Sequence, residues 1–99
     1  MAYIVEFARS VKEHLRFLSA DQRSRVLVGI EKHLLREPMR ETRNRKPLRP
    51  NPIAPWELRL GELRVFYDVV LGDRHFVRVL AVGWKERNKL FIGGKEFRL

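Results

Sequence analysis

The sequence Trp56-Glu-Leu-Arg-Leu-Gly-Glu-Leu-Arg-Val-Phe-Tyr-Asp68 decides the fold, because it reads as two strands joined by a tight turn. Apolar and polar residues alternate before Gly61-Glu62, with the period of two that a half-buried strand shows. A glycine beside a polar residue between two such runs is typical of a hairpin turn. We therefore expect an antiparallel hairpin that places Glu57 and Arg59 on the face opposite its apolar side chains.

Further strands are expected on both sides of this hairpin. Its second strand covers residues 63 to 70, and residues 3 to 7 are rich in β-branched and aromatic side chains, as in a short first strand. Residues 76 to 82 follow the Gly72-Asp73 turn and are almost wholly apolar, which is typical of a central strand covered on both faces. A further short strand fits residues 89 to 92.

Two helices are expected between the first strand and the hairpin. Apolar residues recur at helical spacing over residues 9 to 18, which predicts an amphipathic helix there. The sequence Ser19-Ala-Asp-Gln22 fits a capping box and marks the start of a second helix. Pro38 cannot continue a helix, so we expect this one to end near Glu37. The short connection predicts an antiparallel helical hairpin.

These elements predict an α+β fold in a single domain over residues 1 to 99. The expected order is βααβββ with a possible additional strand, and the N-terminal strand and helical hairpin pack on one face of a mostly antiparallel sheet. Because the helices cover only one face, the other face is where polar and charged strand residues gather. That second face is the expected place of function.

The composition favours a partner that carries negative charge. The chain has 21 Lys and Arg against 12 Asp and Glu, a formal net charge of +9, which suits a phosphate backbone or an acidic protein. No cysteine is present, which excludes disulfides and thiolate metal sites. The apolar runs are shorter than the roughly 20 residues that a membrane helix needs, so we expect a soluble cytoplasmic protein without a membrane partner.

The positive charge is densest in the loop before the hairpin. Residues 38 to 55 contain all five prolines, which restrict the backbone and remove hydrogen-bond donors, so the loop is expected to be stiff and extended. The cations that follow Arg40 in the sequence are the candidate RNA-binding residues. The alternative is that their charge only keeps the protein soluble. These cations are Arg43, Arg45, Lys46 and Arg49.

Three stretches resemble the RelE/ParE superfamily of toxins from type II toxin-antitoxin systems: Lys46-Pro-Leu48, the hairpin from Trp56 to Asp68, and Val79-Leu-Ala-Val-Gly-Trp-Lys-Glu-Arg87. The resemblance spans nearly the whole chain, and the hairpin is its most specific part. It implies a small toxin that a cognate antitoxin neutralises by wrapping its surface. It also implies an endonuclease that acts on mRNA in the ribosomal A site, with no cofactor.

The resemblance also implies site residues. Arg64 matches the hairpin arginine of the mRNA-cleaving members, Lys85 and Arg87 match their later basic cluster, and Arg59 supplies a cation on the second strand. Two positions differ from the family pattern. Glu57 stands where a well-studied branch has a lysine, and Phe91 occupies the approximate place of a tyrosine.

These residue types suit RNA cleavage without a metal. The reaction needs a base for the 2′-hydroxyl, positive charge at the developing phosphorane and a proton for the leaving 5′-oxygen. The guanidinium fork matches a phosphate, so Arg64 and Arg87 are the candidate transition-state stabilisers. Glu57 is a candidate base, and Lys85 is the alternative base or proton donor. Arg59 and Glu57 also fit a solvated edge that carries simple ion pairs.

Two other functions stay open at this point. One branch of the superfamily inhibits DNA gyrase by binding it, which would leave mRNA intact. A weakly active relative that binds RNA or antitoxin without cleavage is the other alternative, and the residues Glu57 and Phe91 favour it.

Overall fold

The computed structural model describes residues 2–98, which form two helices and seven strands. Both helices lie in the first half of the chain, and five of the seven strands lie in the second half. In chain order, the elements are β1 (Ile4–Phe7), α1 (Arg9–Arg16), α2 (Ala20–Leu34), β2 (Arg45–Pro47), β3 (Trp56–Leu60), β4 (Leu63–Val70), β5 (Phe76–Glu86), β6 (Lys89–Ile92) and β7 (Lys95–Phe97).

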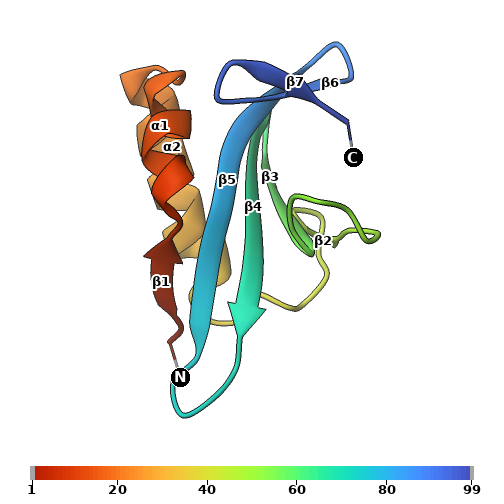
Figure 1. The fold of residues 1–99 in the computed structure, drawn as a ribbon. Helices are drawn as coiled ribbons and strands as arrows, with labels where there is room; N and C mark the ends of the chain where they lie inside the picture. Colours follow the sequence, from red (N-terminus) through yellow and green to blue (C-terminus); the bar gives the residue numbers. More distant parts are fainter. Residues whose placement is uncertain (1, 99) are drawn as a thin grey trace.

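The strands form one sheet, and both helices lie on the same side of it (Figure 1). The order is β2-β3-β4-β5-β6-β7 with antiparallel neighbours, while β1 pairs with β5 in parallel. Strand β5 is long enough to share one edge between two partners, since β1 pairs with residues 76–79 and β6 with residues 83–86. The α+β fold class is confirmed, and so are the strand at 63–70 and the short strand at 89–92.

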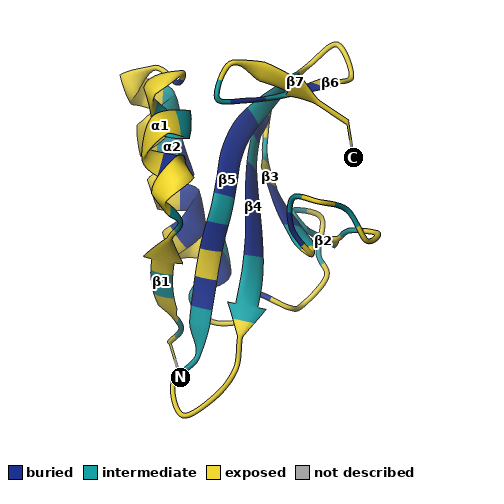
Figure 2. Ribbon diagram, viewed as in Figure 1, coloured by how far each residue is buried: buried dark blue, intermediate teal, exposed yellow. Residues whose placement is uncertain are grey.

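The two helices begin where the sequence predicts and end earlier. The capping box is present: the Gln22 backbone N–H donates to Ser19 Oγ at 3.1 Å, and the Ser19 N–H donates to Gln22 Oε1 at 2.9 Å. Helix α2 ends at Leu34, where the His33 carbonyl accepts a hydrogen bond from Arg45 at 2.7 Å. The outward sides of both helices are largely exposed (Figure 2). Within residues 2–98, no helix is long and apolar enough to cross a membrane.

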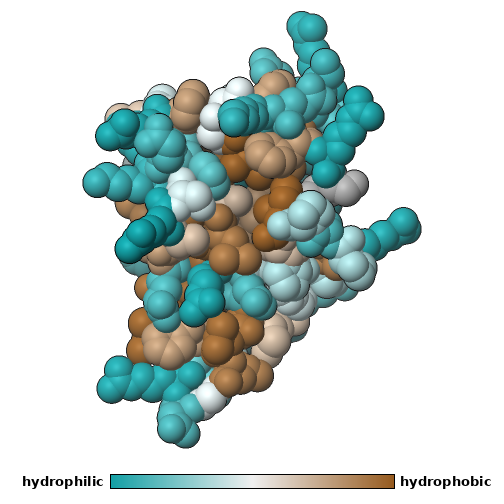
Figure 3. Space-filling view, in the orientation of Figure 1, coloured by the Kyte–Doolittle hydropathy of each residue, from teal (hydrophilic) through white to brown (hydrophobic). Residues whose placement is uncertain are grey.

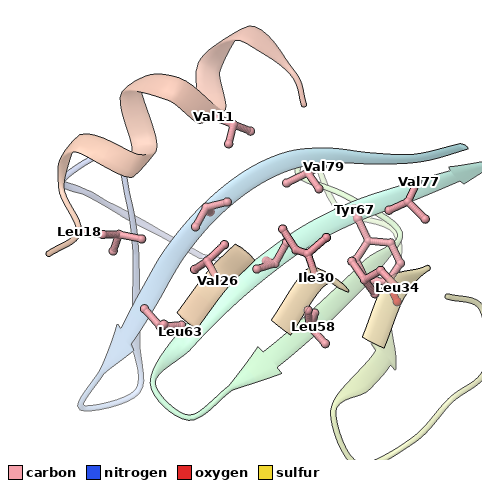
Figure 4. Packing of buried hydrophobic residues seen from close by; sticks show 12 residues of the cluster. Val11, Leu18, Val26, Ile30, Leu34, Leu58, Leu63, Tyr67, Val77 and Val79 are labelled. Carbon is pink, nitrogen blue, oxygen red and sulfur yellow. The ribbon is translucent and has the colours of Figure 1, made fainter. Parts of the chain in front are cut away.

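The main core lies between the helices and the sheet (Figure 4). Helix α2 contributes its buried stripe, and strands β3, β4 and β5 contribute the residues of their helix-facing side. Trp56 packs against this core and stacks on Tyr67 with ring centroids 6.1 Å apart. The buried members are Val11, Leu18, Val26, Ile30, Leu34, Leu58, Leu63, Val65, Tyr67, Val77, Val79 and Val82.

Strand β5 is apolar on both faces because it contributes to an apolar cluster on each side of the sheet, and a β-bulge interrupts its pairing with β4. Tyr67 pairs with Val79 and Phe66 pairs with Ala81, so Leu80 is an extra residue without a partner in β4. The bulge keeps Val79 and the later Val82 in the main core, although they are three residues apart.

A smaller apolar cluster lies apart from the main core, on the second face, the side of the sheet away from the helices. Figure 3 shows hydrophobic residues gathered along the middle of the molecule, with hydrophilic residues projecting around them. The cluster joins the strands to the proline-rich loop, which covers part of this face. Its members are Ala54, Phe66, Ala81, Leu90 and Ile92, with Leu48, Ile53 and Leu80 packed against them.

Replacing Tyr67 with phenylalanine is expected to lower the free energy of unfolding by about 1–2 kcal/mol, because a buried carbonyl loses its partner. The Tyr67 hydroxyl donates to the Pro38 carbonyl at 2.6 Å and ties the end of the helical layer to β4. Burial also raises the pKa of Tyr67, so the hydroxyl keeps its proton at neutral pH. Chemical denaturation measures the change. A variant as stable as the original chain would show that the hydrogen bond contributes nothing.

Stability is expected to fall as the pH drops below about 6.5, and His14 is one cause. The Val82 backbone N–H donates to His14 Nδ1 at 3.3 Å, which needs an unprotonated nitrogen. Burial lowers the pKa of His14 below its ordinary value of 6.5, and the charge of Glu13 opposes this in part. The unfolded chain therefore takes up the proton first. Denaturation of H14Q at pH 7.5 and 5.5 should show a smaller loss than the unmodified chain, and equal losses would contradict this role.

Candidate nucleic-acid interface

The hairpin and β5 place a row of residues across the second face. Arg59 in β3 pairs with Arg64 in β4, and Arg64 pairs with Gly83 in β5. One step along the strands, Glu57 pairs with Phe66. Paired residues of antiparallel strands project to the same side, so Glu57, Arg59 and Arg64 share this face. We call these three residues the arginine–carboxylate cluster.

Glu57 is the buried centre of this cluster. Its side chain is only 1% exposed, Oε1 lies 2.7 Å from Arg59 Nε, and Oε2 lies 3.7 Å from Arg64 Nε. Two arginines directly opposite each other repel, and the carboxylate between them offsets that repulsion. A charged carboxylate is costly to bury unless cations pair with it, and the two arginines are those cations. The alternative of a solvated edge with simple ion pairs is therefore wrong for Glu57.

Arg64 is held in place by backbone carbonyls as well as by the carboxylate. Its Nη1 donates to the carbonyls of Gly61 and Leu63, and its side chain is 13% exposed. Its Nε is buried and has no hydrogen-bond partner among the described residues. Burial lowers the pKa of Arg64 and the charge of Glu57 raises it, but a guanidinium stays protonated at any physiological pH. Arg59 is less constrained, with 44% of its side chain exposed.

Lys85 and Arg87 lie at the end of β5, beyond the cluster. Lys85 is half-buried and follows Gly83 by two residues, so it projects to the same face. Arg87 is exposed in the β5–β6 turn, where it and Asn88 have φ angles of 51° and 67°. The two residues line a groove of about 490 Å³ together with Lys89, Glu96, Phe97 and Arg98. The structure thus brings the two predicted cations together.

Phe97 is an exposed aromatic residue on this face, and the placement of Phe91 at the site is wrong. Phe91 stacks on Trp84 with centroids 5.5 Å apart, and Trp84 packs against the main core on the helix side. Phe97 in β7 pairs with Leu90, which itself pairs with Lys85, so Phe97 lies beside the cations. The residue is 39% exposed, and its ring can stack on a base. It has no hydroxyl for proton transfer.

The four loop cations are not equivalent. Arg45 lies on the helix side, where its guanidinium donates to the carbonyls of His33 and Arg40, so it stabilises the end of α2. Lys46 pairs with Glu57 across β2 and β3 and joins the second face, with Nζ 3.8 Å from a Glu41 oxygen. The remaining two, Arg43 and Arg49, are exposed on the loop.

Asparagines anchor this loop to the sheet. The Arg59 N–H donates to the Asn44 carbonyl, and Asn44 Nδ2 donates back to the Arg59 carbonyl, both at 2.8 Å. Further along, Asn51 Oδ1 accepts from the N–H groups of Ile53 and Ala54. The loop is therefore an ordered wall of the second face, as its prolines predict.

The second face offers positive charge in a fixed arrangement. Arg59, Arg64 and Lys85 all project to it, and hydrogen bonds to the backbone hold Arg64. Such donors suit a phosphate or the more highly charged phosphorane that forms from it. Glu57 is enclosed by its arginines, and a carboxylate in this position has no open path to a 2′-hydroxyl. Its predicted role as a base does not fit the geometry.

Comparison with known proteins gives one informative match. No protein-family model matches the sequence, and no curated protein sequence matches it. The structure is similar to a chain of the toxin-antitoxin complex RelBE2 from Mycobacterium tuberculosis, with a TM-score of 0.67 and 26% sequence identity. The match covers 86% of this chain and 100% of that chain. It confirms the fold and the resemblance inferred from the sequence.

Proposed function

We propose, from the premise that this chain is a RelE-like toxin by its fold, that it inhibits translation by cleaving mRNA on the ribosome. The observation that carries the proposal is the gathering of Arg59, Arg64 and Lys85 on one face, beside the Arg87 groove. RelBE2 is a toxin-antitoxin complex, which supports a cognate antitoxin as the regulating partner. Ribosome and mRNA are the proposed targets.

Arg64 is the proposed electrostatic stabiliser of the transition state. During cleavage the 2′-oxygen attacks phosphorus, and the phosphorane that forms carries more negative charge than the starting phosphate. Arg64 lies at the floor of the face and cannot rotate freely, because two backbone carbonyls hold it. Hydrogen-bond donors that are already in place stabilise the charge that develops in the transition state most strongly, because no side chain has to move during the reaction. Arg59 and the exposed Arg87 then hold the neighbouring phosphates.

Lys85 is the proposed proton-transfer group. It projects to the same face as Arg64, and its ammonium group can donate a proton to the leaving oxygen. Water takes the proton of the 2′-hydroxyl as the new P–O bond forms, and Lys85 gives a proton to the 5′-oxygen as the old P–O bond breaks. The products are a 2′,3′-cyclic phosphate and a free 5′-hydroxyl, with no net gain or loss of atoms.

A second candidate is an RNA-binding relative that cleaves weakly. The observation that favours it is Phe97, which supplies an aromatic face beside the cations but no hydroxyl. Such a protein would bind RNA and antitoxin and cut slowly. This candidate would be favoured if the bound mRNA were cleaved on the order of a hundredfold more slowly than the protein binds it.

The test is cleavage of a defined mRNA by the purified protein, with and without programmed ribosomes. We expect cutting on ribosomes only, with fragments that end in a cyclic phosphate and begin with a 5′-hydroxyl. End-group analysis identifies these products. Intact mRNA together with trapped gyrase–DNA complexes would overturn the proposal in favour of gyrase inhibition.

A further inference from the structure

We propose that Glu57 is an internal counter-ion that competes with RNA phosphate for Arg59 and Arg64. The inference rests on the proposed function, because it assumes that these arginines meet a phosphate. Each carboxylate oxygen of Glu57 faces one arginine, 2.7 Å from Arg59 Nε and 3.7 Å from Arg64 Nε. A phosphate presents its oxygens to two guanidinium groups in the same way.

The two arginines are not equally committed to Glu57. Arg59 is hydrogen-bonded to it, but Arg59 is 44% exposed and can turn toward solvent. Arg64 Nε lies too far from the carboxylate for a hydrogen bond, and it has no other partner among the described residues. Arg64 Nε thus remains a donor without a hydrogen bond, and a phosphate oxygen reaches it when the exposed Arg59 side chain turns away from Glu57. The cluster thus holds both arginines in position, and some of their N–H groups remain without an acceptor in the described part of the chain.

The carboxylate also changes the charge that RNA meets. Without it, the paired arginines would present two adjacent positive charges to the backbone, and with it the cluster carries one. Because Glu57 is 1% exposed, solvent screens its charge poorly and its effect on a phosphate at the same arginines is strong. Glu57 is therefore a positioning residue that weakens phosphate binding as it orders the site.

The test compares E57Q, which keeps the shape and loses the charge, with E62Q as a matched control. Glu62 lies on the same hairpin and is 43% exposed, and it pairs with Arg25 of α2 at 2.9 Å. Both variants change the net charge equally. The probe is a fluorescent 2′-O-methyl RNA, which cannot be cleaved, and anisotropy is measured over a range of salt concentrations.

We expect E57Q to bind this RNA on the order of 10-fold more tightly than the unmodified chain at low salt. The salt dependence should steepen by about one phosphate contact. The E62Q control should change affinity less than twofold. Equal or weaker binding by E57Q, including no binding by either protein, would overturn the inference, as would an equal gain in E62Q.

A second measurement on the unmodified chain covers the case in which E57Q does not fold. Inorganic phosphate is titrated while NMR follows the Nε–H signals of Arg59 and Arg64. We expect both signals to move as phosphate replaces the carboxylate, and unchanged signals would overturn the inference. Neither measurement involves cleavage, so a failure here is separate from a failure of the proposed endonuclease activity, which the ribosome assay tests.

Discussion

Replacing Arg64 with alanine is expected to lower the rate of mRNA cleavage on programmed ribosomes by a factor on the order of 10² to 10³. Arg64 is the least exposed cation of the arginine–carboxylate cluster, and two backbone carbonyls fix its guanidinium. The variant removes a preorganised donor that acts where charge develops. The rate of fragment formation from a defined mRNA gives the measurement.

Two controls separate chemistry from folding. Arg16 lies on α1 with 70% of its side chain exposed, so R16A makes the same charge change on the helix side and should retain full activity. R64K keeps a positive charge beside Glu57 but lacks the bidentate guanidinium group. Compared with R64A, we expect this variant to be more stable but to gain little cleavage activity. Thermal unfolding of each variant identifies any loss of structure. A folded R64A protein that cuts at the original rate would remove Arg64 from the mechanism.

Replacing Gly83 with alanine is expected to lower the free energy of unfolding by about 3 kcal/mol and to leave much of a marginal domain unfolded. A Cβ at this position would lie 1.9 Å from the Phe91 carbonyl oxygen, which belongs to the backbone of β6. Relief requires the two paired strands to separate. Since Gly83 also pairs with Arg64, that separation would disturb the site.

Gly72 provides the matched control for this substitution. It lies in the loop between β4 and β5, and a Cβ there would approach no closer than 3.7 Å to any other group. We expect G72A to change stability by less than about 0.5 kcal/mol. Urea denaturation of both variants gives the comparison, and equal stabilities would show that β5 and β6 adjust without cost.

The strands that alternate clearly were predictable, and the shortest ones were not. The hairpin around Gly61-Glu62 and the capping box at Ser19 carry local patterns that tertiary packing did not override. Strands β2 and β7 have three residues each, too few to show a period, and they exist because a neighbouring edge is available for pairing. The extension of β5 to Glu86 has the same cause, since β6 pairs with it there.

The candidate site was predictable in its residues and less so in its arrangement. Strand alternation placed Glu57 and Arg59 on the second face, but burial of Glu57 depends on the loop and on Arg64 across the strand pair. The aromatic residue was assigned to Phe91 because β7 was not expected. Pairing of β7 with β6 places Phe97 beside Lys85, while the β5–β6 register pairs Phe91 with Trp84 on the helix side. The burial of Glu57 and the position of the aromatic residue both depend on the pairing register of the strands, which no local sequence pattern encodes.

Cleavage on this face is expected to proceed through attack by the 2′-hydroxyl of the mRNA. The most direct measurement uses an mRNA with a single 2′-deoxynucleotide at the position cut in the unmodified message, presented on programmed ribosomes. We expect the unmodified mRNA to be cut and the substituted one to stay intact at that position, because the attacking oxygen is missing. Equal cutting of both messages, or of neither, would contradict the claim.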